Sequence, residues 1–307
     1  MAFVANMTGT TELDSSIVLA FEQSFLVANG QNNVMDQLAQ VNTQIGAKSI
    51  QLTKYARLAL ATTPLTEDED AARTAMSDTA VILTPAEYGR VVTRTNLASL
   101  QSGGKADLAA AQVVGFNAGS TMDKLAVLAL NGGTEVFAGA GSDAGLVAGD
   151  ICDAAFLNRM YNKLARSNVQ SIGGAYVAVL HDDQIHDLRA ASGAGSWQDV
   201  VKYTDAMPAL ANEVGMFKGF RIVRNNNIVY ADQGGAGTVD SYRGLFLGAN
   251  ALGKAESQAM SLRVTGPFDA LGRFVNVGWY AVTAYGIIDS DAAFVGITSS
   301  SVGANAA

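Results

Sequence analysis

Hydrophobic and polar residues alternate almost strictly along residues 48–60, which predicts a β-strand with one apolar face. The apolar positions are Ile50, Leu52, Ala56, Leu58 and Leu60, and the polar positions are Ser49, Gln51, Thr53, Tyr55 and Arg57. A second strand-like segment follows at Thr79–Asn96, after an acidic loop that contains a proline. Because an isolated two-stranded hairpin is at best marginally stable in water, we expect this hairpin to lie across a neighbouring copy of the protein.

Opposite charges gather at the two ends of the predicted hairpin. Glu87 is the only acidic residue of the stem, whose basic residues are Lys48, Lys54, Arg57, Arg90 and Arg94. The loop is acidic at Glu67, Asp68, Glu69, Asp70 and Asp78. Charged ends of this kind can fix the register of two copies, and the expected inter-subunit contacts are Lys54, Arg57, Glu67, Asp68, Glu69, Asp70, Arg90 and Arg94. The pattern indicates a building block rather than an enzyme.

The longest helical pattern covers Lys105–Leu130. Small or apolar residues recur at steps of three and four, as on one buried helix face: Leu108, Ala111, Gly115, Ala118, Met122, Leu125 and Ala129. At 1.5 Å per residue, this helix would be roughly 39 Å long. Glycine disfavours a helix interior, so Gly115 and Gly119 predict either a bend or a strand lying close against the helix.

Shorter patterns predict the remaining elements. Asp150 is expected to cap a second helix, Ile151–Ser167, with Phe156, Met160 and Leu164 on its inner face. A strand at Ala175–Leu180 leads into a short helix at Gln184–Ala191. The other expected strands are a hairpin of Phe217–Arg224 and Ile228–Ala231 around Asn225–Asn227, then Arg243–Ala249, Ala259–Thr265, Phe274–Gly286 and Ala293–Thr298. Helices and strands mix without regular βαβ alternation, which indicates the α+β class.

Composition fits a large protein core and few charges. The chain has 307 residues, of which 49% are hydrophobic and only 16% charged, and its mean hydropathy is +0.18. Such a surface suits either a chain that buries much of itself against other copies or an ordinary protein rich in alanine and glycine. The net charge of −8 argues against tight nucleic-acid binding, which needs clustered basic residues. We expect no signal peptide and no membrane span, and therefore a soluble protein made in a cytoplasm.

The strongest candidate for catalysis is the motif His181-Asp182-Asp183-x-x-His186, whose residue types suit a metal-dependent hydrolase. However, five residues of helix would turn the two histidines about 140° apart. The alternative is that Asp182 or Asp183 caps a helix and that the histidines lie on the surface. The acidic run at 67–70 lacks the ligand spacing of a calcium loop. Cys152 has no evident base partner, and a buried apolar role is expected for it. We predict no catalytic, cofactor or metal site.

The order of the elements resembles that of the major capsid proteins of tailed double-stranded DNA phages, the Hong Kong 97-like fold. The closing segment adds to the likeness through Gly266-Pro267-Phe268-Asp269, Gly278-Trp279-Tyr280-Ala281 and Ala284-Tyr285-Gly286. The resemblance implies an N-terminal arm at 1–47, an extended hairpin loop at 48–96, and a spine helix with the first part of a peripheral domain at 97–172. It also implies an axial domain at 173–251, and return strands of the peripheral domain with the C-terminal tail at 252–307.

What the resemblance implies for function is self-assembly. Copies of the chain would join as hexamers and pentamers into an icosahedral head that encloses double-stranded DNA without reading its sequence. It would be assembled in the host cytoplasm, without a cofactor, and portal, scaffolding and decoration proteins are further possible partners. Three alternatives stay open: an encapsulin-like compartment shell, a hydrolase using His181, Asp182 and His186, and a β-rich tail or fibre protein.

Overall fold

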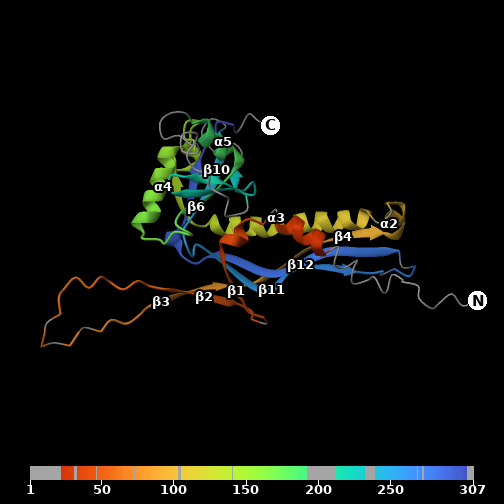
Figure 1. Ribbon diagram of the computed structural model, residues 1–307, viewed down its shortest axis with the longest axis horizontal. Coiled ribbons are helices and arrows are strands. Elements are labelled where there is room, and N and C mark those ends of the chain that lie inside the picture. Colours follow the sequence, from red (N-terminus) through yellow and green to blue (C-terminus); the bar gives the residue numbers. More distant parts are fainter. Residues whose placement is uncertain are drawn as a thin grey trace, which may run out of the picture.

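The computed structural model describes residues 22–30, 33–45, 47–65, 67–68, 70–71, 73–102, 105–139, 141–191, 212–231, 239–267, 269–271 and 273–302. Figure 1 shows a long helix lying along an elongated sheet, a second sheet with its helices at one end, and a hairpin that projects beyond that end. Helices and strands are mixed along the chain, so the predicted α+β class is confirmed.

The long helix α3 spans Lys105–Leu130, the bounds that the sequence pattern predicts. It lies on a four-stranded sheet with the order β1 (Ala39–Thr43), β11 (Leu252–Thr265), β12 (Phe274–Ile287) and β4 (Ala86–Thr95). The short helix α2 (Asn96–Ser102) lies between β4 and α3 in the chain. The core between helix and sheet contains Phe25, Val114, Ala118, Met122, Val277, Trp279 and Ala281.

The buried face of α3 follows the predicted stripe only in its middle. Ala111, Gly115, Ala118 and Met122 are buried, whereas Leu108 is 44% exposed. Leu125 and Ala129 are only half-buried, and the buried positions near the end are instead Ala126, Val127 and Leu130. Steps of three and four average 3.5 residues per turn, so a real helix drifts by about 20° per heptad away from such a stripe. The drift turns the last two turns of α3 toward a second core.

Gly115 and Gly119 serve a close contact, but the neighbour is not the strand that we predicted. Residues 22–30 are helical and cross α3 there. A Cβ added at Gly115 would lie 2.6 Å from the backbone oxygen of Phe25, and one at Gly119 would lie 2.7 Å from that of Asn29. Glycine is thus required at both positions because the backbone of the crossing helix occupies the space of a side chain.

The second sheet has the order β5 (Thr134–Phe137), β13 (Ala293–Thr298), β10 (Ser241–Leu247), β6 (Tyr176–Leu180), β8 (Phe220–Arg224) and β7 (Glu213–Phe217), with β9 (Tyr230–Ala231) paired to β10. Helices α4 (Ala154–Arg166) and α5 (Asp182–Ala190) belong to this part of the fold, and short 3₁₀ turns lie at Met35–Leu38, Asp143–Gly145 and Ser290–Ala292. All six residues of β13 are buried.

Two local predictions in this region are wrong. Helix α4 begins later than expected, because Asp153 rather than Asp150 is its cap and accepts a 2.7 Å hydrogen bond from the Phe156 backbone nitrogen. The predicted inner face of α4 is nevertheless buried as expected. The hairpin predicted around Asn225–Asn227 is also wrong. The hairpin in this region is formed by β7 and β8, and its turn contains Lys218 and Gly219, both at positive φ.

A buried carboxylate joins three distant segments of the chain. Asp123 on α3 is fully buried; its Oδ1 accepts hydrogen bonds from the backbone nitrogens of Val34 and Met35, both at 3.1 Å. Its Oδ2 accepts from the side-chain amides of Asn225 at 2.6 Å and Asn227 at 2.9 Å. Burial raises the pKa of this carboxyl, and the four donors reverse only part of that rise. Asp123 therefore ties the N-terminal segment and the 225–227 turn to the spine helix.

We predict that Asp123→Ala lowers the free energy of unfolding by about 3 kcal/mol, because buried donors that lose their acceptor are costly. Urea unfolding of the unassembled chain measures the change. The control is Asp68→Ala, which removes an exposed carboxylate and should cost less than about 0.5 kcal/mol. Equal stability of the two variants would show that Asp123 does not hold these segments together.

Candidate inter-subunit surface

The projecting hairpin begins as a short antiparallel pair, β2 (Ile50–Tyr55) and β3 (Asp78–Leu83). Its register runs from Ile50 opposite Leu83 to Tyr55 opposite Asp78. The predicted first strand is thus too long, since it ends at residue 55 and not at 60. From 56 to 77 the described residues form no strand, and the loop extends away from the body (Figure 1).

The predicted second arm of the hairpin is two strands in two different sheets. Strand β3 pairs with β2, whereas β4 pairs with β12 beside the long helix. Thr84 and Pro85 lie between them outside either strand. Proline cannot donate a backbone hydrogen bond, so it interrupts a strand at such a place. The sequence contains this break, but the apolar pattern on both sides of it conceals the change of partner.

Apolar side chains fix the base of the hairpin to the four-stranded sheet. Ile50 and Leu52 are buried there, and so is Leu83 on the opposite strand. A Cβ at Gly253 would collide with Leu52, and one at Gly286 would collide with Leu83. The two glycines thus form a hollow in the sheet surface that the hairpin fills.

Three of the four basic residues expected in inter-subunit contacts have partners within the chain. Lys54 Nζ lies 2.5 Å from Asp289 Oδ1, and Arg94 Nε lies 3.0 Å from Asp107 Oδ1. Arg57 donates a hydrogen bond to the backbone oxygen of Asn168. These contacts hold the stem against its own subunit. A role for the same residues between subunits stays a prediction.

The remaining charged candidates that the structure describes are exposed. Arg90 has no ion-pair partner among the described residues, and the same holds for Glu67 and Asp68 in the loop. Asp70 pairs only with Arg73, at 3.2 Å, with both side chains more than four-fifths exposed. Glu69 lies outside the described residues. The loop therefore presents acidic groups that its own chain hardly uses.

Large apolar side chains of the same loop are exposed as well. Leu58 is 57% exposed, Leu60 88%, Leu65 78% and Met76 71%. The alternating pattern predicts an apolar face at residues 58 and 60, and in the single chain that face covers nothing. Exposed apolar residues combined with unpaired charges are typical of a surface that another protein molecule covers.

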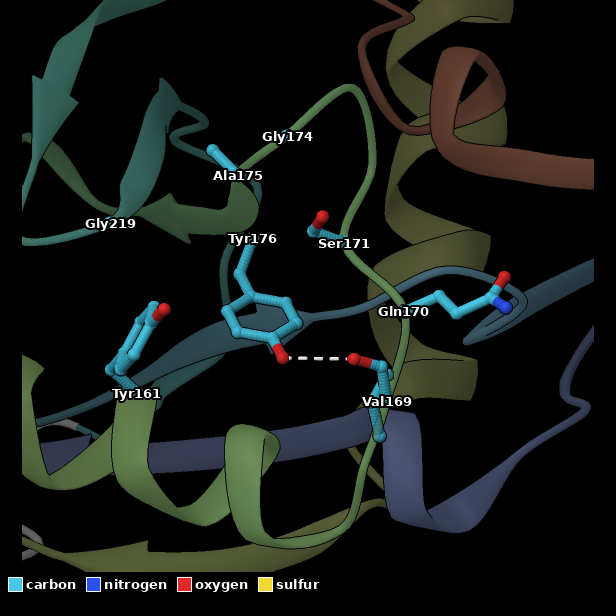
Figure 2. A pocket seen from close by; sticks show the side chains of 8 residues that line it. All are labelled: Tyr161, Val169, Gln170, Ser171, Gly174, Ala175, Tyr176 and Gly219. Carbon is cyan, nitrogen blue, oxygen red and sulfur yellow. Dashed lines mark hydrogen bonds between the residues drawn. The ribbon is translucent and has the colours of Figure 1, made fainter.

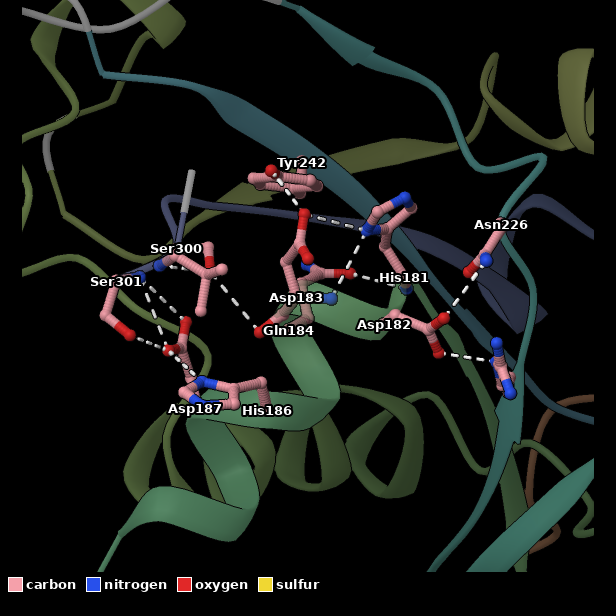
Figure 3. Close-up of polar contacts among 12 residues, drawn as sticks. His181, Asp182, Asp183, Gln184, His186, Asp187, Asn226, Tyr242, Ser300 and Ser301 are labelled. Carbon is pink, nitrogen blue, oxygen red and sulfur yellow. Dashed lines mark hydrogen bonds and ion pairs between the residues drawn. The ribbon is translucent and has the colours of Figure 1, made fainter. Parts of the chain in front are cut away.

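His181 forms the N-terminal end of a helix (Figure 3). It is the N-cap of α5: its Nδ1 accepts from the backbone nitrogen of Asp183 at 3.3 Å, and its backbone nitrogen donates to Gln184 at 3.2 Å. We had expected Asp182 or Asp183 to be the cap, and that prediction is wrong. An imidazole nitrogen with a free lone pair can accept the same bond as a carboxylate, which sequence rules for caps do not anticipate.

The other members of the motif turn to different partners (Figure 3). Asp182 pairs with Arg224 at 2.6 Å and accepts from Asn226 at 3.0 Å. The His186 side chain is 61% exposed, and its Nδ1 is 3.7 Å from the buried Asp187. Asp183 is the one member beside His181, with its Oδ2 3.1 Å from the His181 Nδ1, and it also accepts a hydrogen bond from Tyr242 at 2.6 Å. Within the described ranges, no group of three or more histidine, cysteine, aspartate or glutamate residues could hold a metal ion.

A cavity of about 540 Å³ lies beside the end of α4 (Figure 2). Tyr176 crosses it and donates a 2.9 Å hydrogen bond to the backbone oxygen of Val169; burial raises the pKa of this phenol. The cavity is lined by Tyr161, Val169, Gln170, Ser171, Gly174, Ala175, Tyr176 and Gly219. The lining contains no carboxylate, imidazole or ammonium group, and its ionisable side chains are the phenols of Tyr161 and Tyr176.

Among the described residues, no helix is long and apolar enough to span a membrane. No known protein family matches the sequence, and no curated protein matches it.

Solved structures do match. The capsid of Ralstonia phage GP4 superposes with a TM-score of 0.71 at 15% identity, over 88% of this chain and 92% of that chain. The capsid asymmetric unit of cyanophage Pam1 gives 0.66 at 12% identity, over 98% and 96%. The virus-like particle from Pyrococcus furiosus gives 0.56 at 14% identity, over 90% and 98%. This chain therefore has the Hong Kong 97-like capsid fold, as its resemblance implies.

We predict that trypsin cuts the unassembled chain first in the projecting loop, at Arg73, whose side chain is 92% exposed. Mass spectrometry of a short digest identifies the cut. The turn residue Arg273 is also exposed, but it is held by Asp269 and should be cut later. Early cleavage at Arg166 on α4, with Arg73 intact, would show that the loop packs on its own subunit.

Proposed function

We propose that this chain is the major capsid protein of a tailed double-stranded DNA phage, which assembles as hexamers and pentamers into an icosahedral head. The observation that carries the proposal is the likeness of nearly the whole chain to phage capsid structures. The projecting loop supports it, because its exposed leucines and acidic groups need a partner that the single chain does not supply. The head would be assembled in the host cytoplasm.

The assignment of domains within the subunit is part of this proposal. The N-terminal arm would be 1–47, the extended hairpin loop 48–96, the spine helix with the first peripheral part 97–172, the axial domain 173–251, and the return strands with the tail 252–307. Residues 1–21, 31–32 and 46 of the arm, and 192–211 and 232–238 of the axial domain, lie outside the described residues. Portal, scaffolding and decoration proteins are the further partners that such a head would engage.

An encapsulin-like compartment shell is the second candidate. The virus-like particle from Pyrococcus furiosus matches this chain with a TM-score of 0.56, below the 0.71 of the Ralstonia phage capsid, so the likeness supports this candidate less than the phage head. Fold and loop would serve the same self-assembly in this case. The contents of the particle would differ, because a compartment encloses proteins and a head encloses DNA.

We predict that the expressed chain forms closed particles, visible by negative-stain electron microscopy after size-exclusion chromatography. Particles purified from infected cells should contain nuclease-protected DNA if the chain forms a phage head, and protein cargo if it forms a compartment. A chain that stays monomeric at every salt concentration and pH would contradict self-assembly of either kind.

We also predict that the acidic loop contacts Lys or Arg on an adjacent subunit. Replacing Glu67, Asp68, Glu69 and Asp70 together by arginine should impair or redirect assembly, because attraction between the charges becomes repulsion. The effect should be largest at low salt, where screening is weakest. Light scattering follows assembly, with the same residues replaced by glutamine as the control for lost attraction alone. Normal shells from the arginine variant at low salt would contradict the contact.

A further inference from the structure

The short helix at residues 22–30 runs in the same direction as α3 where the two cross. The backbone of Phe25 lies over Gly115, and that of Asn29, about one turn later, lies over Gly119. The chain before residue 22 therefore leaves this contact toward the N-terminal end of α3. In Figure 1 that is the end of α3 beyond which α2 lies.

An apolar trough continues in that direction beside α3. Its floor is the last part of β11, where Met260, Leu262 and Val264 alternate onto one face of the sheet. This is the face that carries α3, because Leu262 pairs with Trp279 and Val264 pairs with Val277, and both partners belong to the core under the helix. Met260 and Leu262 are partly buried against that core, and Val264 is 43% exposed.

The first turns of α3 form the wall of the trough. Leu108 lies seven residues before Gly115, about two turns of helix, and is thus on the face that the short helix covers. Leu108 is nevertheless 44% exposed, whereas Phe25 is buried in the core between the same helix and sheet. Leu108 and Val264 extend this core past Phe25, and no described residue buries them.

The sequence just before residue 22 has the pattern that such a trough requires. Counting back from Phe25 in helical steps of three and four gives Phe21, Val18 and Ile17, which are all large and apolar. Neither glycine nor proline occurs from residue 10 to residue 29, so no helix breaker separates these positions from the short helix. The apolar face that Phe25 presents to the core can therefore continue toward the N-terminus.

Length and charge agree with this fit. The stretch 17–25 would be about 12 Å long as a helix, and the stretch 260–264 spans about 13 Å as a strand. Lys105, the first residue of α3, is exposed and has no ion-pair partner in the part of the chain that the structure describes. Asp14, a favourable residue for a helix N-cap, comes at the end of the segment that would lie nearest to Lys105.

We propose that residues 14–21 of the same chain continue the short helix and fill the trough. Phe21 and Val18 pack between Leu108 and the end of β11, where they remove apolar surface from water. Asp14 caps the helix and meets the Lys105 ammonium.

The occupant is the chain's own segment because it is joined directly to a helix that already lies at one end of the trough. A covalent connection of this kind gives a far higher effective concentration than a second molecule has in solution. The arm from residue 14 onward is then part of the folded subunit, and residues 1–13 are left for contacts with other molecules. The inference does not depend on the proposed self-assembly.

Cross-linking within one chain tests the position of the segment. Val18→Cys is paired with Val264→Cys in a Cys152→Ala background, in the full chain kept below the concentration at which it assembles. A short bis-maleimide should join the two thiols in protein that runs as a monomer on a denaturing gel, and mass spectrometry identifies the linked peptides. The control pairs Val18→Cys with Arg263→Cys, the neighbouring residue on the opposite face of the sheet, which should react at least tenfold less.

Amide hydrogen exchange tests the apolar face of the segment. In the wild-type chain, the amides of residues 14–21 should exchange at least tenfold more slowly than those of residues 1–10. Val18→Asp should abolish this protection, because it places a charge in the trough. Leu19→Asp has the same cost in helix propensity but is turned about 100° away from Val18, so it should retain most of the protection.

Three results would overturn the inference: equal cross-linking of the two cysteine pairs, cross-links found only between chains, or equal loss of protection in the two aspartate variants. Links between chains would assign the trough to a second copy. In each case the proposed function would stand, because it rests on the fold and not on this segment.

Discussion

The subunit depends on the burial of one carboxylate inside its longest helix. Asp123 is surrounded by four donors from segments roughly 90 and 100 positions away along the chain. Its neighbours along α3 divide between two cores: Met122 packs on the four-stranded sheet, and Ala126 packs on the second sheet. A buried charge is costly unless every lone pair is used, so this residue permits only one arrangement of the arm, the helix and the 225–227 turn.

A second charged network extends this constraint to the sheet. Lys254 on β11 lies 2.9 Å from both Asp36 and Glu256, and Tyr285 on β12 donates to Asp36 at 2.6 Å. Burial disfavours the Lys254 ammonium, but the two carboxylates outweigh burial and raise its pKa. The segment before β1 is thus held by α3 through its backbone and by the sheet through Asp36.

Sequence patterns predict what local periodicity determines. The bounds of α3 and β13 follow from their apolar spacing, and so does the buried face of α4. The split between β3 and β4 does not, because the strand pattern is the same whichever sheet the residues join. The hollow formed by Gly253 and Gly286 is invisible for a similar reason: the two glycines lie on different strands and become neighbours only through strand register. The sequence shows that the loop is acidic, but only the structure shows that the loop is exposed.

The stem and the loop of the hairpin are held by different molecules under the proposed function, and this separates folding from assembly. Leu52 and Leu83 are buried within the chain, and Lys54 and Arg57 bind their own subunit, so the stem is positioned before any partner arrives. The loop beyond residue 56 contributes almost no burial to its own chain. Its leucines can therefore change without unfolding the subunit, whereas changes in the stem alter both processes. A rigid base that carries an unpartnered loop lets each copy fold first and bind its neighbour afterwards.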